Sequence, residues 1–408
     1  QGLNDRRRHM YVVGKTGMGK STLLMTLILQ DIDAGRGVFL LDPHGDLCED
    51  VLARIPSYRA DDVIVLDPSE EARPMGINIL ESENEADKYR IVNEFIAMLQ
   101  RLYDPHNQAI VGPIFQQTVR NAMLAAMSMP DGTLIDVYRI ISDNEYIKRV
   151  LPFITDPLVK AYYEDIVRKM SGASDHWKAE LLPYLLSKFS RFVEDATLRR
   201  MIGQPRTSIP WHKVIEEQKI LLVNLAKGRV GQDNASFIGG LVLSGMLQAA
   251  FKRGELPINK RKDFFMYIDE VQNFSTPMLA TMLSEGRKFG VVLTIANQFL
   301  HQLDHTILEA VFGNVGSMVA FRVGTQDAPA LAPEMYPSFG MGDLINLPQF
   351  TAAVKLMVDG VAARPFTMKT LPPMRPPDRA SAETIRRMSG LRYGADMALV
   401  QRAIMEKF

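Results

Sequence analysis

The chain has 408 residues, 47% of them hydrophobic, so it can bury a large core and is expected to form two structural units of a soluble, globular protein. Lysine plus arginine and aspartate plus glutamate both number 47, which excludes an overall basic field, so any contact with a polyanion must be local. The single cysteine, Cys48, excludes an internal disulfide and a cysteine-based zinc site, and this usage is typical of a reducing cytoplasm.

The N-terminal part alternates short apolar runs with helical patterns. Residues 10–13 read as a strand that enters a glycine-rich loop, and residues 21–35 follow with helical apolar spacing that ends at Gly35. Two further strands, 37–43 and 62–68, each close on Asp-Pro, with a helix between them. This alternation predicts an α/β fold with a mostly parallel central sheet that is covered on both faces.

The middle of the chain loses the strand pattern. From about residue 85 to about residue 204 only helical patterns are found, at 86–103, 112–129, 156–170, 176–193 and 195–203. We therefore expect an all-α domain, residues 82–215, inserted into a nucleotide-binding domain that is built from residues 1–81 and 216–371.

Strand character returns after the insertion. Apolar runs that read as strands lie at 219–228, 263–270, 291–298, 317–324 and 351–360. The most apolar helical run, residues 238–251, is shorter than the roughly 18 residues of a membrane-spanning helix and predicts a buried core helix. The last segment, 372–408, opens with Pro-rich sequence and is expected to form a peripheral tail.

The stretch GKTGMGKS, Gly14 to Ser21, fits the phosphate-binding pattern G-x-x-x-x-G-K-[ST] between a strand and a helix. Its glycines let backbone N–H groups turn toward phosphates, Lys20 is expected to reach the β and γ oxygens, and the Ser21 hydroxyl to ligate magnesium. The pattern predicts ATP and Mg²⁺ as cofactors. The residues expected to bind the nucleotide are Gly14, Lys15, Thr16, Gly17, Met18, Gly19, Lys20, Ser21 and Thr22.

An acidic pair follows the strand at 263–268. At the carboxyl edge of a parallel sheet, Asp269 is expected to hold the magnesium ion and Glu270 to take a proton from the attacking water. The alternative is that the pair only begins a helix, since carboxylates suit helix N-termini.

Two further polar residues stand near the next strand. Gln298 ends the run at 291–298, where it could sense the γ-phosphate or be an ordinary loop residue. Arg287 and Lys288 close a helical segment before that strand, and cations there commonly complement the helix dipole. The residues alone leave these roles open.

Taken in order, the segments VVGKTGMGKSTLL, LLDPHGDL, ILLVNLAKGRVG, YIDEVQNF, SEGRKFGVVLTIANQFLHQLD and MVAFRVGTQDA, with a helical insertion, resemble conjugative coupling proteins of the TraG/TraD type. These proteins belong to the FtsK–HerA group of RecA-like hexameric motors. The resemblance, over residues 9–370, implies that Arg287 is an arginine finger to the neighbouring subunit's nucleotide, Gln298 the sensor, Asp269 the magnesium ligand and Glu270 the base.

The chain also departs from the pattern of these families. Coupling proteins usually carry N-terminal membrane helices and HerA-type helicases an N-terminal β-barrel, and the sequence, which starts without methionine, shows neither. The sequence is therefore compatible with a membrane anchor or an accessory domain upstream of residue 1. The expected location is the cytoplasm, including the cytoplasmic face of the inner membrane.

A basic, glycine-bearing segment at 226–236 is expected to form a flexible loop and is a candidate contact for DNA. Lys227 and Arg229 could touch DNA phosphates in a ring channel without sequence preference, and an ordinary solvated loop is the alternative.

The leading functional prediction is an ATPase, stimulated by DNA, that translocates DNA through a homo-oligomeric ring, expected to be a hexamer. The expected partners are DNA, a relaxase and the channel proteins of a type IV secretion apparatus. The alternatives are an ATPase that energises protein export, a HerA-like DNA-processing helicase and a nucleotide-gated cargo receptor. A small-molecule P-loop kinase ranks last, because the sequence shows no acceptor pocket.

Overall fold

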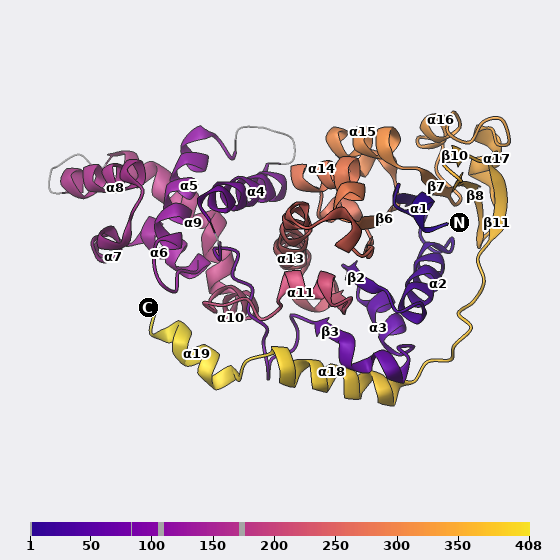
Figure 1. The fold of residues 1–408 in the computed structure, drawn as a ribbon. Helices are drawn as coiled ribbons and strands as arrows, with labels where there is room; N and C mark the ends of the chain where they lie inside the picture. The colour runs from indigo at the N-terminus through magenta and orange to yellow at the C-terminus, as the bar shows by residue number, and fades with distance from the viewer. Residues whose placement is uncertain (1, 83, 105–109, 171–175) are drawn as a thin grey trace. The chain divides into compact units, whose positions relative to one another are not determined.

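The computed structural model describes residues 2–82, 84–104, 110–170 and 176–408 (Figure 1). The chain folds into two compact units. The first, here called the sheet unit, comprises Gln1–Asp67, Pro210–Arg229 and Leu243–Ser389; the second, the helical unit, comprises Pro68–Ile209, Val230–Val242 and Gly390–Phe408. Each unit is described separately below.

The sheet unit is built on a nine-stranded sheet whose order is β11-β8-β7-β1-β6-β5-β2-β4-β3. The strands are β1 (Met10–Val13), β2 (Gly37–Asp42), β3 (Val63–Leu66), β4 (Ile220–Asn224), β5 (Phe264–Ile268), β6 (Val291–Asn297), β7 (Ser317–Ala320), β8 (Thr351–Lys355) and β11 (Phe366–Lys369). All pairs from β7 to β3 are parallel, whereas β8 and β11 are antiparallel to their neighbours. The predicted α/β fold with a mostly parallel central sheet is confirmed.

Burial explains why the predicted strands form the centre of this sheet. Every residue of β2, β3, β4, β5 and β6 is buried, as expected for parallel strands that helices cover on both faces. The α-helices that lie wholly within the sheet unit are α1 (Leu3–Arg6), α2 (Lys20–Asp33), α3 (Asp46–Leu52), α11 (Trp211–Glu216), α14 (Pro277–Glu285), α15 (His305–Asn314), α16 (Ala328–Leu331) and α17 (Met341–Asn346). Its 3-10 turns are η1 (Ser57–Asp62), η3 (Arg253–Glu255), η4 (Ile258–Lys260), η5 (Val271–Asn273), η6 (Gly286–Phe289) and η7 (Leu300–Gln302).

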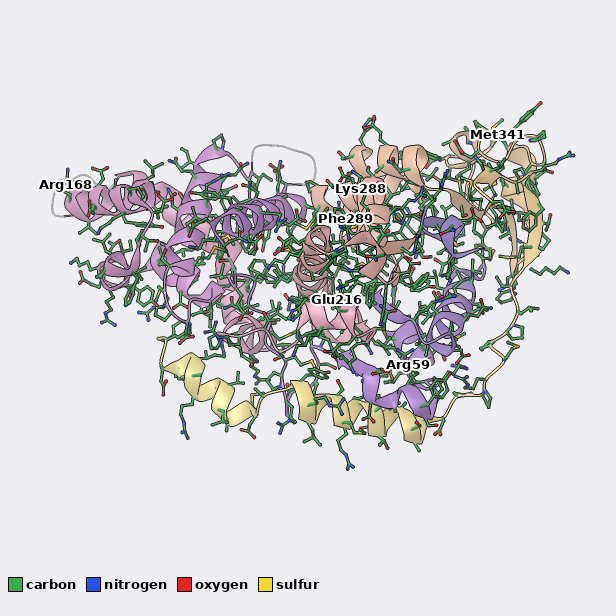
Figure 2. All side chains as sticks on the ribbon, viewed as in Figure 1. Arg59, Arg168, Glu216, Lys288, Phe289 and Met341 are labelled. Carbon is green, nitrogen blue, oxygen red and sulfur yellow. The ribbon has the colours of Figure 1, made fainter. Side chains whose placement is uncertain are left out.

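Buried arginines tie these turns to the sheet. Arg59 of η1, labelled in Figure 2, donates from Nη2 to the carbonyl of Gln218 at 2.7 Å, just before β4. Arg253 of η3 donates from Nη2 to the carbonyl of Lys262 at 2.6 Å, just before β5, and from Nε to the carboxylate of Glu216, also labelled there, at 2.8 Å. Because each guanidinium has several donors in one plane, it satisfies loop carbonyls that burial would otherwise leave unpaired.

The strand predicted at 351–360 is shorter in the structure. β8 ends at Lys355, and the following residues form a two-stranded hairpin of β9 (Met357–Val358) and β10 (Val361–Ala362). Asp359 and Gly360 have φ values of 49° and 80° at its turn. An Asp-Gly pair favours such a turn, because both positions need positive φ.

The tail predicted to be peripheral is in part a core element. α18 (Arg379–Tyr393) buries Ala382 and Ile385 in the core of the sheet unit and runs alongside α3 in Figure 1. The Ser389 hydroxyl accepts the Val65 N–H at 2.9 Å, and Arg386 pairs with Glu49 at 2.7 Å. The prediction was wrong because β3 is an edge strand, and the helix satisfies and covers part of that edge.

The helical unit contains no strand among its described residues. The helices that lie wholly within it are α4 (Glu85–Tyr103), α5 (Pro113–Met127), α6 (Leu134–Ser142), α7 (Asn144–Val150), η2 (Leu151–Phe153), α8 (Pro157–Met170), α9 (His176–Glu194), α10 (Ala196–Ile202) and α19 (Met397–Met405). Aromatic side chains fill its core. The rings of Phe192 and Phe237 stack with centroids 3.7 Å apart, and Phe95 lies 6.1 Å from Phe189.

The boundaries of the compact units differ from those predicted for the domains. Residues 68–81 belong to the helical unit, as does the chain after Ser389. Within that unit Arg73 donates to the carbonyls of Gly390 and Gly394 at 3.0 and 3.1 Å, which fixes the C-terminal segment.

The apolar run at 238–251 lies in a longer helix than predicted. α13 (Gln232–Lys252) continues into η3, and this segment, Gln232–Glu255, is long and apolar enough to cross a membrane. However, 72% of its most apolar window is buried inside the protein, as in the core helix of a globular fold. The expectation that this helix is too short to span a membrane was therefore wrong, whereas its burial was expected.

Candidate active site

The glycine-rich loop joins β1 to α2 in a conformation that only glycines adopt readily. Gly14, Gly17 and Gly19 have φ values of 153°, 76° and 115°. Gly14 also lies against the sheet, because a Cβ atom there would meet the Cβ of Phe321 at 2.5 Å. The loop can therefore turn its N–H groups inward, which is the arrangement that holds phosphate groups at a helix N-terminus.

Lys20 begins α2 and is buried, with 7% of its surface exposed. Its Nζ donates to the carbonyl of Gly14 at 2.6 Å, so the ammonium lies within the loop. Burial lowers its pKa, and the charges of Glu270 and Asp269 oppose that shift. Ser21 is exposed on the first turn of the same helix, and Thr22 is half-buried.

Asp269 and Glu270 follow β5 and are both buried. Burial raises the pKa of Asp269 to about 7; the charges of Glu270 and Asp42 act in the same direction, and Lys20 opposes them. Asp269 accepts the N–H of Glu270 at 3.0 Å, and Glu270 has a left-handed backbone with φ of 48°. Two carboxylates thus crowd one ammonium, which favours the binding of a further cation there.

A chain of hydrogen bonds joins the loop to these carboxylates. The Thr16 hydroxyl donates to Oε1 of Gln298 at 2.9 Å, and Nε2 of Gln298 donates to Oε1 of Glu270 at 2.8 Å. The other carboxylate oxygen of Glu270 accepts from Nε2 of Gln272 at 2.7 Å. The strand order explains this meeting, because β6 lies between β1 and β5 and all three end at the same edge of the sheet.

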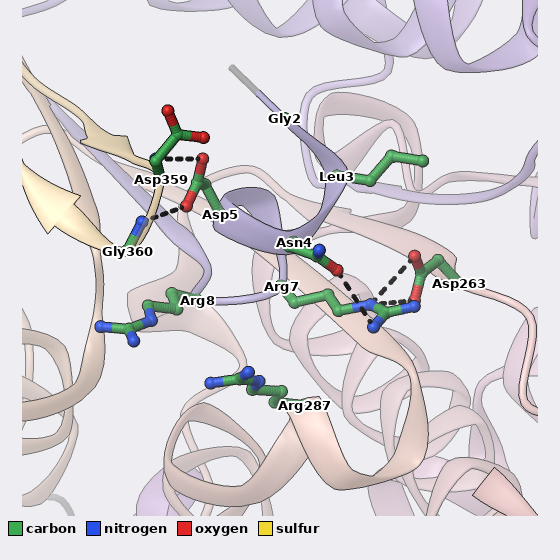
Figure 3. Close-up of a pocket in the computed structure, with 10 residues that line it drawn as sticks. All are labelled: Gly2, Leu3, Asn4, Asp5, Arg7, Arg8, Asp263, Arg287, Asp359 and Gly360. Atoms are coloured by element: carbon green, nitrogen blue, oxygen red, sulfur yellow. Dashed lines mark hydrogen bonds and ion pairs between the residues drawn. The ribbon is translucent and has the colours of Figure 1, made fainter. Parts of the chain in front are cut away.

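Arg287 lies elsewhere. It belongs to η6, before β6, and lines a cavity of about 640 Å³ together with residues that precede β1 and β5, among them Arg7, Arg8 and Asp263 (Figure 3). β6 has seven residues, so at ~3.3 Å per residue it separates Arg287 from Gln298 by about 20 Å. The structure therefore brings together Thr16, Lys20, Asp269, Glu270 and Gln298, and places Arg287 at the opposite edge of the sheet.

The cavity around Arg287 is charged. Arg7 pairs with Asp263 at 2.8 Å, and the carboxylate of Asp5 accepts the N–H groups of Asp359 and Gly360 at 3.0 and 2.9 Å. Arg8 and Arg287 extend toward the same side of the cavity in Figure 3, and neither has an ion pair within the described ranges of the chain. Lys288, labelled in Figure 2, pairs instead with Glu285 at 3.2 Å on the surface.

His9 fixes the turn that carries Arg287. The imidazole is buried, its Nδ1 accepts the N–H of Leu293 at 3.0 Å, and its ring lies 3.0 Å from where a side chain on Gly286 would begin. Burial lowers the pKa of His9 to about 4, and a hydrogen bond to the Met282 carbonyl only partly offsets this. The folded protein therefore holds His9 in its neutral form.

We expect the free energy of unfolding to fall as the pH is lowered from about 6.5 to about 4. In this window the unfolded chain binds a proton at His9 that the folded chain excludes, so one group contributes a slope of about 1.4 kcal/mol per pH unit. Urea unfolding of wild type and His9→Gln at pH 7, 6 and 5 measures this slope, and glutamine removes the titration. Identical slopes in the two proteins would show that His9 is not the titrating group.

The segment predicted as a flexible loop at 226–236 is largely helical. Lys227 and Arg229 lie in a short helix, α12 (Lys227–Val230), and α13 begins at Gln232. The N–H of Lys227 donates to the Pro43 carbonyl at 3.0 Å, and Arg229 is exposed. The loop prediction was wrong because the two glycines lowered the expected helix propensity, although backbone contacts to the turn after β2 hold the segment.

The donor set fits a magnesium ion that is shared with a nucleotide. Among the residues that the structure describes, no group of three or more histidine, cysteine, aspartate or glutamate side chains could form a metal cage. The Ser21 hydroxyl and the Asp269 carboxylate are hard oxygen donors beside the loop, and Mg²⁺ commonly takes one or two protein oxygens and completes its shell with phosphates and water.

The comparisons with known proteins agree with this arrangement. The profile of the family described as "Helicase HerA, central domain" matches residues 3–226, which is more than half of the chain. The chain belongs to this HerA family. The predicted membership of the FtsK–HerA group is thereby confirmed. A search of curated proteins found no match.

Solved structures share the fold of this HerA-family chain. The bacterial conjugative coupling protein TrwBdeltaN70, in its unbound monoclinic form, superposes with a TM-score of 0.69 at 16% identity over 92% of this chain and 88% of that one. The plasmid coupling protein TrwB in complex with ADP and Mg²⁺ gives 0.67 at 17% identity over 93% and 89%. VirB4 of Thermoanaerobacter pseudethanolicus gives 0.61 at 13% identity over 90% of each chain. The predicted resemblance to coupling proteins is confirmed for the fold.

Three residues of the site were not predicted from the sequence: Gln272, His9 and Arg8. Gln272 comes two residues after Glu270 in the run VQN, and no spacing rule assigns it a contact. His9 and Arg8 precede β1 and act on elements almost 300 residues away. Their contacts depend on the strand order, which local sequence patterns do not contain.

Proposed function

We propose that the protein is a Mg²⁺-dependent ATPase whose nucleotide site lies at the glycine-rich loop. Residues Gly14 to Thr22 hold the triphosphate through backbone N–H groups, and Lys20 pairs with its β and γ oxygens. Ser21 and Asp269 hold the magnesium ion, which when bound neutralises charge on the phosphates. The observation that carries this proposal is the hydrogen-bonded chain from Thr16 through Gln298 to Glu270, beside the buried Lys20.

Glu270 is the proposed general base. Its carboxylate is held on both oxygens by amide N–H groups, so it is oriented without being neutralised. Gln298 contacts both the loop and the base, and it therefore can report the state of the nucleotide to Glu270. The proton removed from water is accepted by Glu270, while Lys20 stabilises charge on the phosphate oxygens.

Arg287 is proposed to act on the nucleotide of a neighbouring subunit. The length of β6 keeps it away from the loop of its own chain, and its guanidinium lines an open cavity at the other edge of the sheet. A ring in which this edge faces the next subunit's loop brings the two together. We propose a homo-oligomer, a hexamer as in the motors that the sequence resembles.

The proposed work is movement of DNA through the ring, without sequence preference. Membership of the HerA family and the shared fold with coupling proteins support a motor that delivers DNA to a conjugative type IV secretion apparatus. The proposed partners are a relaxase and the channel proteins, and the proposed location is the cytoplasm at the inner membrane. The family description favours a second candidate, a HerA-like DNA-processing helicase.

The test is ATP hydrolysis with and without double-stranded and single-stranded DNA, with the mass of the assembly measured in parallel. We expect DNA to raise the hydrolysis rate and ATP to favour the ring, and Lys20→Ala to remove the activity. A rate that DNA leaves unchanged would favour the protein-export alternative. The absence of any hydrolysis in a ring that binds ATP and DNA would favour the cargo receptor.

The DNA contact is expected to include Lys227 and Arg229. Replacing both with glutamine should weaken DNA binding and lower its dependence on salt, since each phosphate contact releases counterions. ATP affinity should not change. Lys260 and Arg364, exposed cations on other elements, provide the control pair when replaced in the same way. An unchanged slope of affinity against salt would exclude this helix and direct the search to the helical unit.

A further inference from the structure

Phe350, in the segment just before β8, has an unusual backbone. Its φ is 60°, in the left-handed region that a bulky residue rarely adopts, and 44% of its surface is exposed. Such a conformation persists only where the surroundings impose it, and residues of this kind cluster at ligand sites. Packing alone does not explain it, because an aromatic ring that served the core would be covered.

Hydrogen bonds hold Phe350 against the glycine-rich loop. Its N–H donates to the Met18 carbonyl at 2.9 Å, and its own carbonyl accepts the N–H of Thr370 at 2.9 Å. The preceding Gln349 donates from Nε2 to the Gly17 carbonyl at 2.9 Å. Because C=O and N–H point in opposite directions across a trans peptide, the N–H groups of Met18 and Gly19 face away from this segment and remain available to phosphates.

The ring itself lies beside the last glycine of the loop. A Cβ atom on Gly19 would be 3.0 Å from Cδ1 of Phe350 and 3.2 Å from Oγ1 of Thr370. Gly19 directly precedes Lys20, so the ring stands next to the first turn of α2. A nucleotide held by the loop would therefore pass close to the exposed part of this ring.

The strand order indicates which end of a bound nucleotide would lie near Phe350. Glu270 and Gln298, the residues proposed to act at the γ-phosphate, follow β5 and β6 on one side of β1. Phe350 precedes β8, and β7 and β8 lie on the other side of β1. With the γ-phosphate toward β6, the α-phosphate and the nucleoside point toward Phe350.

We infer that Phe350 provides the surface on which the base of the bound nucleotide stacks. The inference rests on the proposed function, since it requires a nucleoside triphosphate in the glycine-rich loop. Stacking on an aromatic face accepts any base, and purines present the larger face. The site therefore selects purine over pyrimidine nucleoside triphosphates.

The test compares the binding of Mg²⁺ complexes of ATP, CTP and inorganic tripolyphosphate by calorimetry. Stacking contributes about 1–3 kcal/mol per base, which is about 5- to 150-fold in affinity. Phe350→Ala should weaken the binding of ATP by at least about 5-fold. It should weaken the binding of CTP less and leave the affinity for tripolyphosphate unchanged. Phe350→Tyr should keep ATP binding, whereas Phe350→Leu, which retains apolar bulk without an aromatic face, should lose it.

Phe366→Ala is the matched control, because Phe366 is equally exposed, at 43%, on the edge strand β11. It should bind all three ligands as wild type does. If Phe350→Ala weakened the binding of ATP and of tripolyphosphate equally, Phe350 would only support the loop. Unchanged ATP binding in Phe350→Ala, or full ATP affinity in Phe350→Leu, would also overturn the inference. If wild type bound neither ATP nor tripolyphosphate, the proposed nucleotide site itself would fail.

Discussion

Glu270→Gln is expected to slow ATP hydrolysis by about 10²- to 10⁴-fold, the usual contribution of a general base, while ATP affinity stays close to that of wild type. Glutamine has the shape of glutamate and tolerates the left-handed backbone at this position about as well. The substitution therefore removes the proposed proton acceptor and leaves the surrounding elements in place. Turnover at saturating ATP and the dissociation constant for ATP, measured separately, distinguish these effects.

The contacts of Glu270 can adapt to the change. Gln272 donates to Oε2 of Glu270, and its own Oε1 is buried without a hydrogen-bond partner in the described part of the chain. If its amide turns over, that oxygen can accept from the new N–H of glutamine at position 270. Loss of ATP binding in Glu270→Gln would instead indicate that the carboxylate holds the loop together.

A matched control is Glu309→Gln, on an exposed face of α15. It changes the net charge by the same amount, and we expect it to hydrolyse ATP at the wild-type rate. If both variants were equally slow, the effect would come from charge or assembly and not from a base at Glu270.

The centre of the sheet unit could be predicted from sequence because its strands are short, apolar and bounded by turn residues. The glycine-rich loop could be predicted for a similar reason, since the spacing of its residues is local and the strand and helix that flank it have strong patterns. The acidic pair after β5 gained its interpretation only from that loop. For the strands and the glycine-rich loop the information lies within about 15 residues, which is the range over which periodicity acts.

The contacts that complete the site depend on strand order and are not local. β1 neighbours β6 although almost 300 residues separate them, so no pattern in the chain predicts the bond between Thr16 and Gln298. The positive φ of Phe350 also arises from contacts with the glycine-rich loop far earlier in the chain. The segment that contains α18 was wrongly predicted to be peripheral because its hydrophobic pattern is weakly amphipathic, and its role depends on the open edge of β3.

The separation of Arg287 from the loop of its own chain predicts that Arg287→Ala will be nearly inactive in the proposed ring yet still bind ATP. Arginine fingers contribute about 10³- to 10⁵-fold in other NTPases, because a guanidinium neutralises charge that develops on the γ-phosphate. The control is Lys288→Ala, which removes the adjacent exposed cation and its pair with Glu285. It should retain activity, and Lys288 should not replace Arg287, since an ammonium lacks the planar fork.

The decisive measurement mixes Arg287→Ala subunits with Lys20→Ala subunits, each inactive alone. In a mixed ring some interfaces join an intact glycine-rich loop to an intact Arg287 of the next subunit, so hydrolysis should partly return. If mixing is verified by mass and no activity returns, two explanations remain. The first is that Arg287 acts within its own subunit, and the second is that hydrolysis requires every active site of the ring to be functional. Monomeric protein separates them. A monomeric Arg287→Ala variant that keeps the basal rate of monomeric wild type requires the second explanation, whereas loss of that rate would show action in cis, against the separation that β6 imposes between Arg287 and Gln298.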